Sequence, residues 1–557
     1  MRQINRTHLI LALILILGGL LRFYKLDWGQ GLFTHPDEYH LVISANQLSF
    51  PAQMNPHFFS YGTVTIYLMY FTKAFLSSLY SNFANLNYFL VGRFYSALFS
   101  TLTIFLVYKI SRKFLPEGYA LLAATLTALT PGLIQQAHFA TPESNLIFFL
   151  LASLYFLLKF TGTPDSHISR FSQISFLSLS PIALASIFLG LALGVKVSGA
   201  FFGITLALAI ILKYRPKSSK MILGLVLSVI ITGLILFAVD PYLFLDFPHF
   251  LSSFKYESSL AAGSLPVFYT RQFIGTTPVI FQLTKIYPFA LGLPLLLFGF
   301  LGFFLIIYSI FKSKSVSLTT YPMLLITGFL SLFLPNAFLF AKWTRFVAPT
   351  FPFFAIFAAF FLYKLSQLKI HKHFSLILNS SFLILNSVLL LAFFSIYINQ
   401  DVRTTASNWL LSHANPNSTF FVEEGNMVDL PLEGNFRRVS ANFYNYENNS
   451  QVQFQVIDDL QTADYIIIES RRIFLDHNPK KFPKTAAFYQ ALFSGQLGFS
   501  KIKEFTSYPT ISLLGYKIEF PDETAEETWS VFDHPVIRVF KKVDILKGLK
   551  NGQLLEN

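Results

Sequence analysis

The sequence predicts an all-α polytopic membrane bundle followed by a small α/β domain outside the membrane. Hydrophobic residues make up 53% of the 557-residue chain, charged residues only 13%, and the mean hydropathy is +0.53. After residue 398 the apolar runs give way to helical spacing that alternates with short β-branched segments. A chain this long and this apolar is typical of a protein integrated in a membrane rather than of a single soluble domain.

Apolar runs recur along the first 397 residues, and each approaches or reaches the roughly 20 residues that cross a hydrocarbon core. We predict about eleven spans, near residues 8–24, 88–108, 118–136, 143–160, 181–196, 198–213, 221–239, 286–308, 321–339, 346–364 and 374–397. No small-residue cleavage site follows the first run, so we expect a retained span there rather than a signal peptide.

The short loops predict the orientation of the bundle. Lys109, Arg112 and Lys113 lie between two spans, and the excess of lysine and arginine in such loops marks the cytoplasmic side. The N-terminus is then cytoplasmic, and the C-terminal domain lies outside the cell membrane. Residues 61–80 are also long enough to span, but a span there would reverse every later loop. We therefore expect 61–80 to form a helix that lies at, or dips into, the outer surface.

Four regions follow from this topology. Residues 1–397 form the membrane domain, which includes a first extracytoplasmic loop at 25–87 and an outer lid loop at 240–285, rich in prolines and aromatics. Residues 398–557 form the extracytoplasmic α/β domain. In this domain "RTTASNWLLSHANPNS" and "KTAAFYQALFSG" have helical spacing, whereas "TFFVEE", "DYIIIES" and "VIRVFKK" are typical of strands.

Composition excludes several classes of function. The formal charge is +13, but the basic residues stand at the ends of apolar runs and not on a soluble face, so we predict no nucleic-acid partner. The chain has no cysteine, which excludes disulfides, thiolate metal sites and a cysteine nucleophile. It also has no glycine-rich phosphate loop after a strand and no Ser-His-Asp arrangement that the pattern supports.

The stretch "FTHPDEYHLV" places two adjacent acids, Asp37 and Glu38, shortly after the first span. Thr34 as a cap, a proline in the first turn and acids near the positive end of the helix dipole are typical of a helix start. The acids are therefore open to a purely structural interpretation as first-turn residues of a surface helix. They are equally open to a functional one.

Other unusual polar residues fall at the same outer face. They are Glu143 with His138 before it, Lys196 in a turn between two short spans, Arg93 near a span end, and Lys342 and Arg345 at the outer start of another span. Any one cation could simply extend from a helix end toward water. Together, a carboxylate that can act as a base and cations that can hold a departing phosphate favour a lipid-phosphate-linked sugar as the substrate.

An Asp-Glu pair directly after the first span, followed by "NPHFFSYGTVTIYL", resembles the polyprenyl-phosphate-dependent glycosyltransferases of the GT-C superfold. In particular, the chain is similar to bacterial relatives of the protein O-mannosyltransferases and of the lipid A aminoarabinose transferases. "LGLALGVKVSGA" and "AKWTRFVAPTFPFFA" also resemble segments of that group, as do "ADYIIIESRR", "FYQALFSGQLGF" and "ETWSVFDHPVIRVFKK" in the C-terminal domain.

The resemblance implies a role for each candidate residue. Asp37 is the catalytic base, and Glu38 positions the acceptor or a metal. Glu143 stands where the family usually has a second aspartate. The remaining candidates are Lys342, Arg345, Lys196 and Arg93 for the donor phosphate, and His57, Tyr61 and His138 for the substrate. His57 is also open to interpretation as a packed loop histidine, which we favour.

The expected activity is inverting transfer of a hexosyl or pentosyl group, on the extracytoplasmic face, from a polyprenyl-phosphate donor to a hydroxyl of a protein, lipid or glycan. A divalent cation is not required, since phosphate leaves without protonation; Asp37 and Glu38 are the residues that would hold one. Two alternatives remain, namely a polytopic lipid or sugar transporter and a membrane anchor whose C-terminal domain does the binding.

Overall fold

A computed structural model describes residues 6–162, 180–214, 218–313, 316–368, 372–426 and 429–543. The chain divides into two compact units. The first comprises Met1–Asp27, His35–Ala262 and Thr277–Phe394, and the second Trp28–Thr34, Gly263–Thr276 and Ser395–Asn557.

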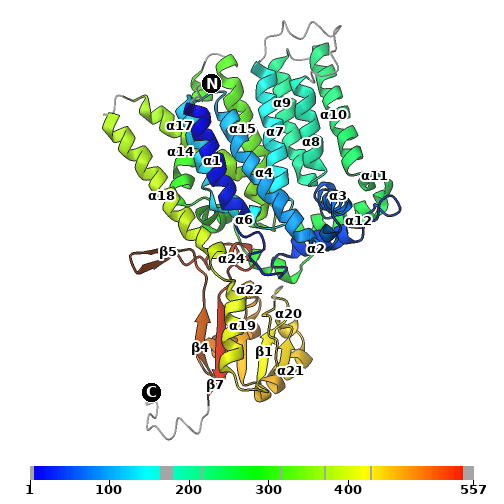
Figure 1. Cartoon of the computed structure of the whole chain (residues 1–557), viewed down its shortest axis with the longest axis vertical. Helices are drawn as coiled ribbons and strands as arrows, with labels where there is room; N and C mark the ends of the chain where they lie inside the picture. The colour runs from blue at the N-terminus through cyan, green and yellow to red at the C-terminus, as the bar shows by residue number, and fades with distance from the viewer. Residues whose placement is uncertain are drawn as a thin grey trace. The chain divides into compact units, whose positions relative to one another are not determined.

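The first unit is helical (Figure 1). Its long helices are α1 (Arg6–Phe23), α4 (Tyr88–Ser111), α7 (Glu143–Gly162), α10 (Ser219–Val239), α14 (Leu293–Lys312), α15 (Val316–Ala337), α17 (Phe351–Ser366) and α18 (Lys372–Ile398). The shorter ones are α2 (Pro36–Asn46), α3 (Val64–Leu79), α5 (Glu117–Ala128), α6 (Pro131–Ala137), α8 (Pro181–Leu193), α9 (Gly203–Lys213), α11 (Tyr242–Leu245), α12 (Phe247–Ala262), α13 (Tyr287–Ala290) and α16 (Thr344–Val347).

Within the described part of the chain, 8 helices are long and apolar enough to cross a membrane, so the protein is a multi-pass membrane protein. The predicted spans at 181–196 and 198–213 coincide with the shorter helices α8 and α9. The predicted span at 118–136 is wrong as a single helix. It breaks between α5 and α6 because Pro131 lacks the N–H that would continue the hydrogen-bond ladder.

A buried arginine completes the helix end at this break. Arg22, at the end of α1, is fully buried, and its Nη1 and Nη2 each donate to a carbonyl at the end of α5, Ala128 O and Thr127 O, at 3.1 Å. Its Nε donates to Ser100 Oγ of α4 at 2.7 Å. These bonds add side-chain partners where the i→i−4 ladder of α5 stops, and they join α1, α4 and α5.

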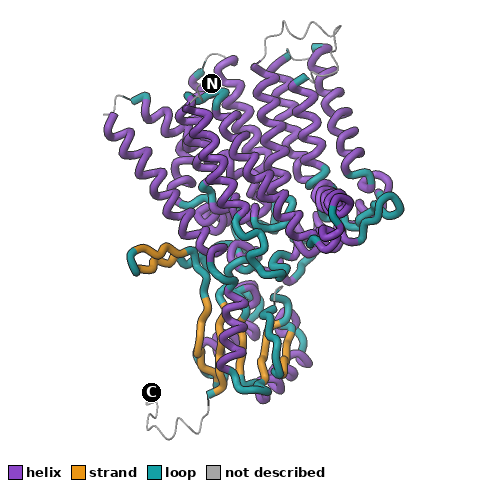
Figure 2. The backbone as a smooth tube through the Cα atoms, in the orientation of Figure 1, coloured by secondary structure: helices purple, strands orange, loops and turns teal. Residues whose placement is uncertain are grey.

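Helix α3 runs across the direction of the long helices. Figure 2 shows it nearly end-on beside helices seen from the side, which is the course expected for residues 61–80 as a surface helix. Within the predicted lid loop at 240–285, residues 247–262 form α12, a helix of 16 residues. Phe247, Phe250, Leu251 and Phe254 recur at helical spacing there, a signal that the prolines and aromatics of the segment obscured.

The second unit contains a five-stranded mixed sheet in the order β2-β1-β3-β7-β4. Strands β1 (Thr419–Glu423), β2 (Arg437–Ala441) and β3 (Tyr465–Ile468) are parallel, whereas β7 (Ile537–Lys542) runs antiparallel to both β3 and β4 (Phe499–Phe505). The helices of this unit are α19 (Val402–His413), α20 (Phe443–Tyr446), α21 (Ser450–Thr462), α22 (Arg472–Asp476), α23 (Pro483–Phe493) and α24 (Glu527–Ser530). A separate hairpin is formed by β5 (Thr510–Leu513) and β6 (Tyr516–Glu519).

Alternate residues of the strands enter two hydrophobic clusters. Phe420 and Val422 pack with residues of α19, whereas Phe421 packs with residues of α21 and α23. Helices thus cover both faces of the sheet, which explains why β1 and β3 read as continuous apolar runs. Helices α19 and α23 lie within or beside the stretches 403–418 and 484–495 that have helical spacing, and strands β1, β3 and β7 lie where their patterns predicted strands.

Candidate active site

Asp37 lies in the first turn of α2, and side chains from two other parts of the first unit contact it. Tyr61 OH donates to Asp37 Oδ2 at 2.7 Å, and Arg345 Nε, from α16, lies 3.1 Å from the same oxygen. The side chain of Asp37 is 13% exposed. The structure therefore brings together the predicted base, one predicted phosphate contact and one predicted substrate contact.

The start of α2 fixes where Asp37 stands. The helix begins at Pro36, with both acids in its first turn, as predicted. The predicted Thr34 cap is wrong, because the N-cap is His35, whose Nδ1 accepts the backbone N–H of Asp37 at 3.1 Å. His35 also packs edge-on against Phe139. Packing and a hydrogen bond both hold His35 in place. As the N-cap, His35 in turn fixes the position of Asp37.

Opposing influences set the pKa of Asp37. Burial raises this pKa, but the guanidinium of Arg345, His35 and the hydrogen bond from Tyr61 outweigh burial and lower it to about 2. Burial also lowers the pKa of His35, against the charge of Asp37. At neutral pH the site therefore holds an ionised carboxylate beside a neutral imidazole.

The neighbouring acid faces a different partner. Arg93 of α4 meets Glu38 at two points, with Nε 2.6 Å from Oε1 and Nη2 2.9 Å from Oε2. The backbone N–H of Ala140 also donates to Glu38 Oε1, at 3.0 Å, and Arg93 Nη1 donates to Leu26 O, at 2.6 Å. Both side chains are buried, so the geometry favours a positioning role for the pair.

A second ion pair lies next to Tyr61. Lys196 Nζ contacts Glu143 Oε1 at 3.0 Å, and it stands 5.1 Å from the ring centres of both Tyr61 and Phe346. Glu143 is fully buried, whereas the side chain of Lys196 is 14% exposed. The other carboxylate oxygen of Glu143, Oε2, is buried and makes no hydrogen bond to the described residues. Rings and ions thus form one continuous cluster around Asp37.

Backbone pairing sets Tyr61 against Lys196. Gly62 N donates to Val195 O and Val64 N donates to Gly194 O, each at 3.0 Å. A Cβ on Gly62 would lie 2.1 Å from Gly194 O, so only glycine permits this approach. The contact joins the segment before α3 to the turn after α8 and fixes two site residues from distant parts of the sequence.

The remaining candidates, Lys342, His138 and His57, make other contacts. Lys342 is buried and its Nζ donates to Phe340 O at 2.9 Å. His138 is buried, with its ring nitrogens 2.8 Å from Ile134 O and 3.2 Å from Tyr24 O. His57 is exposed, so its interpretation as a packed histidine is wrong. Its backbone N–H donates to Asn55 Oδ1 in a tight turn.

Sequence reasoning missed Asp240, which directly follows α10. Thr63 Oγ1 donates to Asp240 Oδ1 at 3.2 Å, and burial raises the pKa of Asp240 to about 6. The sequence also left His35 unassigned. The available signals were the proline after His35 and an acid at the very end of an apolar run, but neither identifies a partner.

The described side chains around Asp37 and Glu38 do not form a binding site for a metal ion. Among the described residues no group of three or more His, Asp or Glu side chains is placed to hold one. Both oxygens of Glu38 contact Arg93, and Asp37 faces Tyr61 and Arg345. Two adjacent acids with separate cationic partners do not supply the oxygen-rich shell that Mg²⁺ or Ca²⁺ requires.

Comparisons with known proteins agree with the predicted resemblance. The family model described as Dolichyl-phosphate-mannose-protein mannosyltransferase matches residues 14–254, less than half of the chain. This segment includes Asp37, Glu38, Tyr61, Arg93, Glu143 and Lys196. No curated protein matches the sequence.

Several solved structures are similar to this one. The oligosaccharyltransferase of Archaeoglobus fulgidus, tethered to an acceptor peptide, is 15% identical with a TM-score of 0.51, over 86% of this chain and 72% of that one. ArnT from Cupriavidus metallidurans is 12% identical with a TM-score of 0.45, over 95% and 97%. The Pmt1-Pmt2 complex of S. cerevisiae is 18% identical with a TM-score of 0.33, over 45% and 35%. The matched segment and the shared fold confirm the resemblance to the polyprenyl-phosphate-dependent glycosyltransferases of the GT-C superfold.

Proposed function

We propose that the protein is an integral-membrane glycosyltransferase that moves a sugar from a polyprenyl-phosphate donor to an acceptor hydroxyl, with inversion at the anomeric carbon. The observation that carries the proposal is the contact of Asp37 with both Tyr61 and Arg345. A carboxylate beside a cation provides a proton acceptor and a phosphate contact within one site. The match of residues 14–254 to the mannosyltransferase family supports this assignment.

Asp37 acts as the general base. One of its oxygens takes the proton of the acceptor hydroxyl while the acceptor oxygen attacks the anomeric carbon. The bond from that carbon to the phosphate oxygen breaks on the opposite side, and polyprenyl phosphate leaves with the electron pair. The glycosidic bond forms as that bond breaks, so configuration inverts. Holding both reactants in line supplies a large part of the rate enhancement.

Arg345 links donor binding to the strength of the base. Without the donor, its guanidinium lies against Asp37 Oδ2 and contributes to the low pKa of that carboxyl. A donor phosphate that draws Arg345 toward itself removes part of this influence, and the pKa of Asp37 then rises because burial favours the protonated form. The carboxylate therefore becomes more basic when the donor is in place.

The other charged residues position Asp37 or stabilise the departing phosphate. Glu38 and Arg93 fix the first turn of α2 against α4, which keeps Asp37 in place. Lys196 is the second cation for the departing phosphate, and Glu143 holds it near Tyr61. Lys342 precedes Arg345 by three residues and adds positive charge at the same span start. No step of this mechanism uses a metal ion.

We further propose that transfer takes place on the extracytoplasmic face of the cell membrane, with the N-terminus inside and the C-terminal domain outside. The donor enters from the lipid, because its polyprenyl chain stays in the bilayer. The acceptor is a hydroxyl group of a protein, lipid or glycan on that side. The charge bias of the short loops, including Lys109, Arg112 and Lys113, supports this orientation.

The test is transfer from a radiolabelled polyprenyl-phosphate mannose in proteoliposomes that carry the parent, Asp37→Asn or Asp27→Asn. Asp27 is an exposed acid of the same loop and serves as the matched control. We expect Asp37→Asn to lose transfer and release of polyprenyl phosphate by about a thousandfold or more while it still binds the donor, and Asp27→Asn to keep both. If Asp37→Asn transfers the sugar as fast as the parent, Asp37 is not the base.

A further inference from the structure

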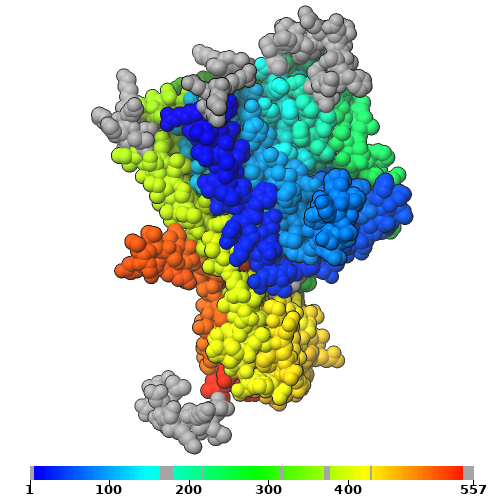
Figure 3. Space-filling view, in the orientation of Figure 1, coloured from blue at the N-terminus to red at the C-terminus, as the bar shows by residue number. Residues whose placement is uncertain are grey.

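We infer that the β5–β6 hairpin of the second unit is a membrane anchor that inserts its tip into the interfacial layer of the bilayer. The hairpin stands apart from the five-stranded sheet, and Figure 3 shows it as a separate protrusion. Its occupant is a lipid surface. The inference concerns the C-terminal unit alone and does not depend on the proposed transferase activity.

The tip is apolar and open. Leu513, Leu514, Tyr516 and Ile518 are 67%, 90%, 78% and 56% exposed. Four large hydrophobic side chains in one short hairpin form an apolar surface that monomeric soluble domains avoid. A two-stranded ribbon has no core of its own to bury them, so something outside the hairpin covers these side chains.

The backbone of the turn between β5 and β6 also indicates that the exposed leucine has a role outside the chain. Leu513 pairs with Tyr516, which leaves Leu514 and Gly515 as the two turn residues, with φ of +52° and +84°. Tight hairpin turns with positive φ at both positions normally take Asn, Asp or Gly. A leucine at such a position is uncommon and gains no buried contact within the chain, since it is almost fully exposed.

The base of the hairpin is tied to the end of a membrane span. The backbone N–H of Thr510 donates to Ser395 Oγ at 3.1 Å, and Tyr397 OH donates to Asp533 Oδ2 at 3.0 Å. Ser395 and Tyr397 lie in the last turn of α18, whose residues 377–398 are long and apolar enough to cross a membrane. The base of the hairpin is therefore fixed to the last turn of α18.

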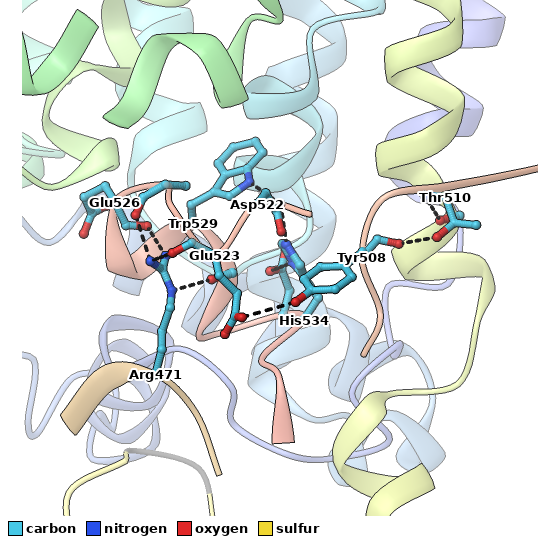
Figure 4. Close-up of polar contacts among 12 residues, drawn as sticks. Arg471, Tyr508, Thr510, Asp522, Glu523, Glu526, Trp529 and His534 are labelled. Carbon is cyan, nitrogen blue, oxygen red and sulfur yellow. Dashed lines mark hydrogen bonds and ion pairs between the residues drawn. The ribbon is translucent and has the colours of Figure 1, made fainter. Parts of the chain in front are cut away.

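A polar network keeps this base rigid (Figure 4). Tyr508 OH donates to Glu523 at 3.2 Å on one side, and Phe520 N donates to Pro509 O at 2.9 Å across the two strands. Beyond them His534 is held between Asp522 and Asp533, and Arg471 binds the carbonyl oxygens of residues 523, 525 and 526. These hydrogen bonds hold the base of the hairpin in a fixed position on the second unit.

The dimensions and chemistry fit the interfacial layer. Four extended residues reach roughly 14 Å, whereas the headgroup region on each side of the hydrocarbon core is about 5–8 Å thick. Tyrosine is enriched at this depth. Lys517, next to Tyr516, pairs with Glu519 at 2.6 Å, and its side chain is long enough to exchange this partner for a lipid phosphate. An interface with a second copy of the chain or with another protein normally includes polar groups that pair across it. The apolar tip of the hairpin offers few such groups.

The chain has no cysteine, so single cysteines can be labelled without background. The full chain is reconstituted in liposomes with a nitroxide on Leu514→Cys, and collision with lipid-soluble oxygen and with a water-soluble nickel complex is measured. Ser450→Cys, an exposed position on α21, is the control. We expect the oxygen-to-nickel collision ratio to be at least about threefold higher at 514 than at 450. Equal ratios would overturn the proposal, and so would a label at 514 that neither reagent reaches, because that result indicates a protein contact.

A second variant guards against a local effect of the cysteine. A nitroxide on Ser512→Cys reports the hairpin while Leu514→Asn and Tyr516→Ser remove the apolar tip, and asparagine suits the positive φ of the turn. We expect the oxygen-to-nickel ratio at 512 to fall to the value at 450. A ratio that stays high would mean that these side chains do not hold the hairpin at the membrane.

Discussion

Glu38 and Arg93 form a buried two-point ion pair that joins the first turn of α2 to α4, with Nε to Oε1 at 2.6 Å and Nη2 to Oε2 at 2.9 Å. Removal of one partner leaves the other charge buried without compensation, which costs about 3–5 kcal/mol. We therefore expect Glu38→Ala to lower the melting temperature in detergent and to abolish transfer. Glu38→Ala combined with Arg93→Leu should regain much of the melting temperature without activity. A Glu38→Ala protein as stable as the parent would contradict this role.

The influence of Arg345 on the ionisation of Asp37 predicts a change in pH dependence. Because Arg345 helps to lower the pKa of Asp37 to about 2, the carboxylate stays ionised from neutral pH down to well below its ordinary pKa. In Arg345→Gln the pKa rises, so the acid limb of the kcat/KM profile moves to higher pH by roughly 1–2 units. Arg345→Lys keeps the charge and should move it less. Profiles of the parent and Arg345→Gln that differ in height but coincide in position would exclude this coupling.

Tyr61 acts on the same carboxylate through one hydrogen bond, at 2.7 Å. Tyr61→Phe removes only that bond, which is worth about 1–2 kcal/mol to a charged acceptor, so kcat should fall roughly tenfold with little change in stability. Tyr256→Phe, on the exposed face of α12, is the matched control and should leave kcat unchanged. Equal kcat values for the two variants would mean that Tyr61 does not help to hold Asp37.

The close approach of Gly62 to Gly194 should be sensitive to a single methyl group. In Gly62→Ala the new Cβ would meet the carbonyl oxygen of Gly194 at 2.1 Å, so the loop must move and carry Tyr61 away from Lys196. We expect transfer to fall by at least about tenfold. Gly118→Ala adds the same methyl group where nothing lies within 4 Å, and it should behave as the parent. Comparable rates for the two variants would show that the approach is not required.

The network around His534 predicts an alkaline weakness of the second unit. Burial alone would lower the pKa of His534, but the carboxylates of Asp522 and Asp533 raise it to about 10. The stability that the protonated ring contributes is therefore complete below about pH 6.5 and is lost as the pH rises toward 10. Hydrogen exchange of residues 522–534 should become faster between pH 7 and 9.5, after correction for intrinsic rates. In His534→Asn exchange should be fast at both pH values; a parent whose corrected rates stay constant would refute this assignment.

Local patterns predicted much of the fold. The apolar runs located the long helices, and the continuous run of Phe420, Phe421 and Val422 indicated a strand. Strands β2 and β4 were missed because they carry charged residues and lie at the edges of the sheet, where one side faces solvent. Helix α12 was missed because its proline and its aromatic residues also suit a loop.

The candidate site was predictable in its members but not in its pairing. Position after the first span singled out Asp37 and Glu38, and the out-of-place cations singled out Arg93, Lys196 and Arg345. Which carboxylate faces which cation depends on how α2, α4 and α16 pack, and contacts between distant segments leave no mark in local spacing. The structure assigns Arg345 to Asp37 and Arg93 to Glu38, a division that the sequence alone does not contain.

The two ion pairs next to Tyr61 are each electrically balanced. Asp37 and Glu143 carry two negative charges, and Arg345 and Lys196 carry two positive ones. In the proposed reaction, the phosphodiester of the donor would compete with a carboxylate for its cation, and that carboxylate would then accept a hydrogen bond from a neighbouring hydroxyl group. Charge balance therefore favours ordered binding. The anionic sugar donor binds first and separates a carboxylate from its cation, and the hydroxyl of the neutral acceptor then binds to that carboxylate.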